Sequence, residues 1–260
     1  MFGYFSNSIG FGQRESIKAT ITRDNLTATV TATCIWYDFS STGTGYSAVP
    51  TTAVNGTSLT SITDLSGKGR NGTPASVSYA TNQAVSLGAA KFPGSTSYIK
   101  VAGMTTYLGS VKGMTAVLAV KTITSATTAY ICGTDQSDLQ IYFSSGKWNV
   151  KFGAATAAST INVMTTNTWQ LHSFVFDGNG ANNNSRLRYR YNKADQGLTI
   201  TGTVPATANA SNDNFAFGAT DFPGSNVYTG YIGECFLWNR ALTVGEVAAI
   251  ETYLGTKWGI

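Results

Sequence analysis

The sequence predicts an all-β fold, a sandwich or a barrel, with one short helix near the C-terminus. Only 12% of the 260 residues are charged, about half the usual share. Polarity comes instead from Thr, which favours strands, and from Ser, Asn and Gly, which favour turns. Short apolar stretches alternate with turn clusters along the chain, and all-β units often reach this length as one domain.

Eleven stretches have the composition and alternation of strands. Turn clusters rich in Gly, Asn and Ser separate them, for example residues 66–72 and 177–184. The predicted strands are residues 34–39, 90–92, 98–101, 115–121, 129–133, 139–144, 148–152, 169–176, 186–192, 214–218 and 230–238.

A helix is predicted close to the C-terminus. Thr243 is followed three residues later by Glu246, the spacing of a capping box, and Gly255 is the expected stop signal. Apolar side chains follow at helical spacing and predict one buried stripe. These residues are Val244, Val247, Ile250 and Leu254.

Residues 1–33 differ from the remainder and predict an aromatic arm followed by a hairpin. The hairpin is indicated by period-two alternation on either side of Asp24 and Asn25. The arm either docks into a neighbouring chain or closes the end of its own sandwich, and both interpretations stay open. Its aromatic residues are Phe2, Tyr4, Phe5 and Phe11.

Several motifs occur in the order typical of one known family. Residues 228–242 (YTGYIGECFLWNRAL) and the helix after them resemble the closing segment of concanavalin A-like, laminin-G-like domains. Residues 35–38 (IWYD) resemble the family's opening strand, and 64–72 (DLSGKGRNG) its glycine-rich turn. Residues 169–178 (WQLHSFVFDG) resemble the strand before its Y-x-N-G hairpin, which reads YRYNK at 189–193, with Lys at the usual Gly.

The resemblance covers residues 34–260 and implies a jelly-roll β-sandwich there, with residues 1–33 as a separate arm and hairpin. Members of this family serve as lectins, glycosidases, adhesion modules and virion proteins. A fold cannot choose among these functions, so the choice depends on the residues themselves.

The carboxylates argue against an enzyme. A glycosidase needs two of them spaced as acid and as nucleophile or base, and related glucanases carry them on one strand as E-x-D-x-E. We expect Glu246 to cap the helix and Glu234 to be structural. The sequence has four glutamates, none in such a pattern: Glu15, Glu234, Glu246 and Glu251.

His172 is the only candidate for a catalytic base of the His type. Period-two alternation places it on the same strand face as Gln170 and Phe174. We expect a hydrogen-bonded strand histidine, not a catalytic one.

No cofactor is expected, and calcium is the alternative. The loops 64–71, 135–138 and 177–184 carry the oxygen ligands that calcium prefers, but Asx-rich turns usually satisfy their own backbone. The cysteines are far apart and lie in apolar stretches, which favours buried free thiols. They are Cys34, Cys132 and Cys235.

Arg186, Arg188 and Arg190 alternate with apolar residues, which predicts three guanidinium groups on one strand face. One interpretation is a solvated outer face. The other is contact with an acidic partner or an anionic glycan, since Arg binds carboxylates bidentately. Aromatic residues in loops suit sugar stacking but equally suit loop packing, so they define no sugar site: Tyr46, Tyr79, Tyr107 and Tyr228.

Charge and hydropathy disfavour two classes of partner, nucleic acid and the membrane. The net charge of +4 is spread along the chain, which disfavours nucleic acid, and no apolar stretch is long enough for a membrane span. The N-terminus lacks the pattern of a secretory signal, so we expect synthesis in a host cytoplasm.

These observations favour a structural virion protein, such as a phage capsid decoration or fibre protein. It would assemble as a homo-oligomer or with other shell proteins, and would contact host glycans. The alternative is a lectin-like module of a secreted or surface protein. A glycoside hydrolase is the third hypothesis, and the scarcity of carboxylates argues against it.

Overall fold

The computed structural model describes residues 34–41, 48–50, 52–124, 128–134, 139–208, 214–220 and 227–260. The predicted N-terminal arm and hairpin therefore lie outside the described residues, and the boundary at residue 33 stays a prediction. Other residues singled out in the sequence also lie outside the described residues: Phe2, Tyr4, Phe5, Phe11, Glu15, Tyr46 and the loop 135–138.

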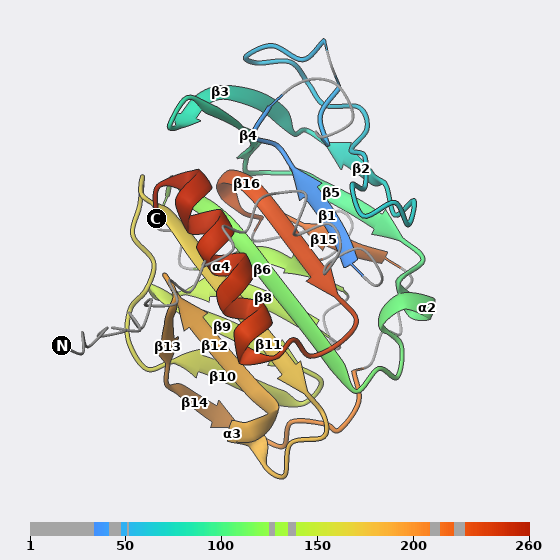
Figure 1. The fold of residues 1–260 in the computed structure, drawn as a ribbon, viewed down its shortest axis with the longest axis vertical. Coiled ribbons are helices and arrows are strands. Elements are labelled where there is room, and N and C mark those ends of the chain that lie inside the picture. The colour runs from blue at the N-terminus through green and yellow to red at the C-terminus, as the bar shows by residue number, and fades with distance from the viewer. Residues whose placement is uncertain are drawn as a thin grey trace, which may run out of the picture.

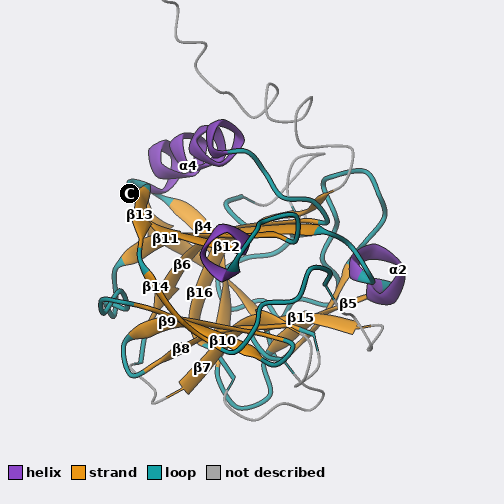
Figure 2. Ribbon diagram, turned by 90° about the horizontal axis from the view of Figure 1, so that it is seen from below, coloured by secondary structure: helices purple, strands orange, loops and turns teal. Residues whose placement is uncertain are grey.

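Two antiparallel sheets pack face to face, which confirms the predicted sandwich (Figures 1 and 2). The helix-side sheet has the order β13-β12-β11-β6-β16-β4-β3, with β1 beside β16. Its strands are β1 (Cys34–Asp38), β3 (Ser78–Ala84), β4 (Leu87–Pro93), β6 (Gly113–Thr122), β11 (Trp169–Asp177), β12 (Leu187–Tyr191), β13 (Ala194–Gln196) and β16 (Thr229–Trp238).

The far sheet has the order β14-β10-β9-β8-β7-β15-β5-β2. Its strands are β2 (Gly72–Ala75), β5 (Tyr98–Ala102), β7 (Thr128–Gly133), β8 (Leu139–Ser144), β9 (Lys147–Phe152), β10 (Ala155–Ser159), β14 (Leu198–Thr201) and β15 (Asn214–Phe217). Three helices accompany the sheets in the described ranges: α2 (Met104–Leu108), α3 (Asn183–Arg186) and α4 (Val244–Trp258).

The burial patterns along the strands show which faces of the two sheets are covered. Along β9 buried and half-buried side chains alternate, as expected for a sheet with one face on the core. Along β6 nearly every side chain is buried, because α4 lies across the outer face of the helix-side sheet (Figures 1 and 2). None of the helices in the described part of the chain is long and apolar enough to cross a membrane.

The C-terminal helix agrees with the prediction at its start and differs at its end. Thr243 and Glu246 form the predicted capping box. The predicted stop at Gly255 is wrong: the helix continues to Trp258 and ends at Gly259, whose φ of 70° is the left-handed conformation that glycine adopts readily. Val244 is also misplaced in the predicted stripe, since it is 59% exposed on the first turn.

The alternation did not reveal all the strands and helices. Five strands of three to seven residues were not predicted: β2, β3, β10, β13 and β14. The first four hold few large apolar residues, and β14 (LTIT) alternates over only four residues. The helices α2 and α3 were also not predicted, since each has at most five residues and no helical period is visible over one turn.

Candidate functional site

A groove opens at one edge of the sandwich, where the chain passes from one sheet to the other. Strand β13 pairs with β12 only opposite Tyr189 to Tyr191, so Leu187 and Arg188 extend beyond its end. Gly197 then leads into β14 of the far sheet, and its carbonyl accepts a hydrogen bond from the Thr160 amide at 3.0 Å. This crossing leaves a hollow of about 470 Å³.

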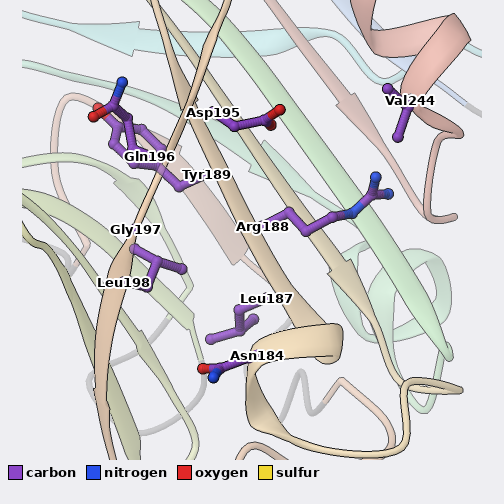
Figure 3. A pocket seen from close by; sticks show the side chains of 9 residues that line it. All are labelled: Asn184, Leu187, Arg188, Tyr189, Asp195, Gln196, Gly197, Leu198 and Val244. Atoms are coloured by element: carbon purple, nitrogen blue, oxygen red, sulfur yellow. The ribbon is translucent and has the colours of Figure 1, made fainter.

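The groove combines an apolar floor with a polar rim (Figure 3). Leu187 and Tyr189 are buried core residues that reach the floor, and the half-buried Leu198 lines it from the far sheet. The remaining lining residues come from α3, β12, β13, the crossing and the start of α4: Asn184, Arg188, Asp195, Gln196, Gly197 and Val244. Small-molecule sites typically have such a mixture of apolar surface and a few polar groups.

A second, wider hollow of about 710 Å³ continues from the groove. The two share Asn184 and Leu198, and the second adds Thr199 and Thr203. The wall near α3 is held by its capping box, in which the Asn182 side chain accepts a hydrogen bond from the backbone N–H of residue 185 at 3.0 Å. Together the groove and the second hollow form a continuous surface rich in amides and hydroxyls.

The three predicted arginines do not share one strand face. Arg186 belongs to α3, because the capping box starts a helical turn there, and its guanidinium donates to backbone carbonyls of Gly180 and Val204. Arg188 and Arg190 do share the outer face of β12. Arg188 donates to the Leu242 carbonyl at 2.9 Å.

Arg190 is not solvated, because α4 covers it. Its side chain is 15% exposed and binds the buried Glu251 of α4 at 3.0 Å and the exposed Asp195 at 2.8 Å. The guanidinium groups thus have partners within the chain. An assembly role for Arg186, Arg188 and Arg190 stays a prediction.

His172 is a core histidine. It shares the inner face of β11 with Gln170 and Phe174, as predicted, and its Nδ1 lies 2.8 Å from the Tyr189 hydroxyl. Its ring stacks on Trp148, with centroids 4.6 Å apart. Burial lowers the pKa of His172 to about 3, so the imidazole is neutral near pH 7.

Each glutamate in the described part of the chain is already bonded to its neighbours. Glu246 caps α4 and pairs with Arg240 at 2.8 Å. Glu251 binds Arg190. Glu234 is fully buried, which agrees with the structural role predicted for it, and accepts hydrogen bonds from Trp36 Nε1 at 2.8 Å and from Lys257 Nζ at 2.6 Å.

The glycine-rich turn at 64–71 uses its carboxylate internally. Asp64 accepts hydrogen bonds from the backbone amides of Trp36, Ser66 and Arg70, and the Asn71 side chain accepts one from the Asp64 amide. Within the described residues, no group of three or more His, Cys, Asp or Glu side chains is placed to hold a metal ion. The three cysteines are buried free thiols, as predicted.

The tyrosines predicted in loops are mostly core residues. Tyr79, Tyr107 and Tyr228 are buried. A tyrosine pair that was not singled out lies instead on the outer face of the far sheet. Tyr130 and Tyr142 sit opposite each other with ring centroids 5.1 Å apart, and period two in their strands was the available signal.

The arrangement of strands defines a concanavalin A-like jelly-roll sandwich, the fold class that the motifs predicted. No family model matches the sequence, and no curated protein matches it. A sialidase from Trypanosoma rangeli, a mutant that displays trans-sialidase activity, is similar in structure, with a TM-score of 0.56 and 13% identity. That match covers 78% of this chain and 32% of the sialidase, so the chain spans about a third of it.

Two further structures are less similar. A heptameric SAP-like pentraxin from Limulus polyphemus matches with a TM-score of 0.46 and 17% identity, over 62% of this chain and 80% of the pentraxin. Domain 4 of an extracellular arabinanase from Geobacillus stearothermophilus, in complex with arabinotriose, matches with a TM-score of 0.44 and 22% identity. It covers 68% of this chain and 82% of that domain. At 13% identity the match to the sialidase shows a shared fold and nothing further.

Proposed function

We propose that this protein is a non-enzymatic binding domain that holds a neutral glycan in the edge groove. The observation that carries the proposal is the lining of that groove. Its floor is apolar, and its rim offers the Asn184 and Gln196 amides beside the Arg188 and Asp195 charges. Sugars present apolar ring faces edged by hydroxyl groups, which suit such a surface.

The charges of the rim favour a neutral ligand over a charged one. Arg188 and Asp195 carry opposite charges, and each has a partner within the chain, the Leu242 carbonyl and Arg190. A hydroxyl group can donate to one and accept from the other. The engaged carboxylates of Glu234, Glu246 and Glu251 support a binding role without catalysis.

A glycan array with the folded full-length chain tests the proposal. We expect retention of a set of neutral glycans, and a loss of at least tenfold in affinity for Asn184→Trp, which fills the groove from its exposed rim. Thr252→Trp places the same side chain on the exposed surface of α4 and is the matched control. Retention of no neutral glycan by the wild type, or equal retention by Asn184→Trp, contradicts the proposal.

The finer proposal is that the domain is displayed on a virion surface and assembles through its N-terminal arm. Its support is the composition, low in charge and rich in Thr, Gly and Asn, and the aromatic residues of the arm. Replacing Phe2, Tyr4, Phe5 and Phe11 with Ser in the full-length chain should convert an oligomer to a monomer. Light scattering measures this mass, and an unchanged mass refutes the role of the arm.

A further inference from the structure

A row of alternating cationic and aromatic side chains crosses the outer face of the helix-side sheet beside α4. The strand registers place Lys91 of β4 opposite Tyr231 of β16, Tyr231 opposite Lys121 of β6, and Lys121 opposite Trp169 of β11. Ser78 of β3 continues the row beyond Lys91. Side chains opposite one another on one face are direct neighbours.

The row is a formed arrangement with defined contacts. The Lys121 ammonium lies 4.5 Å from the centre of the Tyr231 ring and 5.6 Å from that of Trp169. Gln83 contacts both side chains. Its Oε1 accepts a hydrogen bond from the Lys121 ammonium at 2.9 Å, and its backbone carbonyl accepts one from Trp169 Nε1 at 2.8 Å. Gln83 lies where the register between β3 and β4 shifts, the kind of irregularity that redirects a side chain.

A cavity of about 270 Å³ lies at the β3 end of this row. Lys91, Tyr231 and Gln83 line it. Lys121 stands behind this lining, with its ammonium bound to the Gln83 side chain at 2.9 Å. The loop at Asn55 closes the other side, where the Asn55 side chain accepts from the Thr81 amide. The volume is just below the range of about 300–1,000 Å³ that holds drug-sized ligands, so one ring fits.

Lys91 and Lys121 have no acidic partner in the part of the chain that the structure describes. Neither forms an ion pair with any described residue. Burial alone lowers the pKa of Lys121, whereas a nearby carboxylate would raise it. The neighbouring carboxylates of Asp38 and Glu234 are bound to Lys257, at 2.7 Å and 2.6 Å.

We propose that this cavity binds an acidic sugar, carboxylated or sulfated, with the ring against Tyr231 and the acidic group on the Lys91 ammonium. The site is separate from the edge groove, which lies on β12, β13 and β14. The charges distinguish them, because the groove balances Arg188 with Asp195, whereas Lys91 is the charged residue among those that line the cavity. The aromatic ring supplies the apolar contact that sugar faces make.

Calorimetric titration of the full-length chain with trigalacturonate tests the carboxylated form, and titration with a sulfated heparin disaccharide tests the sulfated form. The methyl ester of trigalacturonate is the neutral counterpart of the first probe. We expect at least one acidic probe to bind and the ester to bind at least tenfold more weakly. Lys91→Gln should weaken binding of the acidic probe about tenfold, and Lys121→Gln, behind the lining Gln83, should weaken it less.

Lys147→Gln is the matched control, since Lys147 is a half-buried lysine on the outer face of the far sheet. It should leave affinity unchanged. If Lys121→Gln does not fold, Lys91→Gln alone decides, because the Lys91 side chain forms no hydrogen bond or ion pair with a described residue. The proposal is overturned if neither acidic probe binds, if the ester binds equally, or if Lys147→Gln weakens binding as much as Lys91→Gln. Asn184→Trp should leave this binding intact, which separates the cavity from the groove.

Discussion

The part of the helix-side sheet beneath α4 and the edge strand β14 of the far sheet carry opposite kinds of side chain on their outer faces. On the helix-side sheet, Val117, Val175 and Phe236 point outward and are buried beneath α4. On the far sheet, Thr199 and Thr201 of β14 are exposed in the corresponding outward positions. One face therefore contributes a second apolar core, whereas the other keeps the polar alternation of a sheet with one face on the core.

The apolar outer face is buried only while α4 covers it. The position of α4 therefore depends on its own contacts with the sheet. Three kinds are present: apolar packing at its C-terminal end, a buried charge cluster in its last turns, and the capping box at its start. Their expected contributions fall in that order, because buried area outweighs paired charges and exposed hydrogen bonds.

The largest effect is expected from Trp258→Ala. Trp258 is 2% exposed, its ring lies 4.5 Å from that of Trp169, and it packs so closely on Gly233 that a Cβ there would lie 2.3 Å away. Removing a buried aromatic side chain costs about 3–5 kcal/mol of unfolding free energy. Urea denaturation of the wild type and the variant measures this loss of unfolding free energy.

Thr199→Ala on the exposed far face is the comparison, and should change the unfolding free energy by no more than about 0.5 kcal/mol. A loss below about 1 kcal/mol for Trp258→Ala would mean that α4 is not held by this packing.

The charge cluster gives the helix-side sheet a pH dependence. Burial, and then the neighbouring Asp38, raise the pKa of Glu234 to about 7, although Lys257 opposes the shift. A carboxyl group with a raised folded-state pKa takes up a proton on folding, so its contribution is largest below about pH 4.5 and is lost as the pH rises through 7. Stability from this group should therefore increase as the pH falls from 8 to 5.5.

Denaturation midpoints of the wild type and Glu234→Gln at pH 8, 7, 6 and 5.5 measure this contribution. Glu234→Gln should not show the increase in stability that the wild type shows as the pH falls from 8 to 5.5. Glu246→Gln is the control, because hydrogen bonds from Arg240 hold the pKa of Glu246 at about 2, and its contribution changes only below about pH 4.5. Equal pH slopes for the wild type and Glu234→Gln would refute the assignment.

The sequence predicted most strands that carry strong alternation or dense apolar runs, although the alternating residues of β14 were missed. It also missed what depends on tertiary contacts. The run in β6 and the capping box at Thr243 are local signals, and both were found. Gly255 is permitted within α4 because Trp258 continues the packing beyond it, which the local sequence does not reveal. The turn at Asn192 and Lys193 takes positive φ at both positions despite the Lys where Gly is usual.

The candidate sites were harder to foresee than the fold. The edge groove depends on the end of β13 at Gln196, a strand of three residues with weak alternation. The cavity depends on the register that aligns Lys91 of β4 with Tyr231 of β16, two strands far apart in the sequence. Register is set by pairing across the sheet, so neither site has a signature within one segment.

The smallest of the three effects is expected from Thr243→Ala, at the start of α4. The Thr243 hydroxyl is hydrogen-bonded to the Glu246 amide at 3.2 Å, and the Glu246 carboxylate accepts from the Thr243 amide at 2.8 Å. The substitution removes the first bond and the bond that the Thr243 hydroxyl donates to the Glu246 carboxylate at 3.0 Å. It leaves the bond from the Thr243 amide, which uses the backbone. Loss of such a cap costs about 1 kcal/mol, less than Trp258→Ala because the end of the helix is exposed to water.

Thr252→Ala is its control, since Thr252 is an exposed threonine of the same helix that donates to the Ala248 carbonyl. It should change stability by less than about 0.5 kcal/mol, because alanine is favoured at an exposed helix position. If both variants lose the same amount, the capping box adds nothing specific, and α4 is held on the sheet by its packing and its buried charges alone.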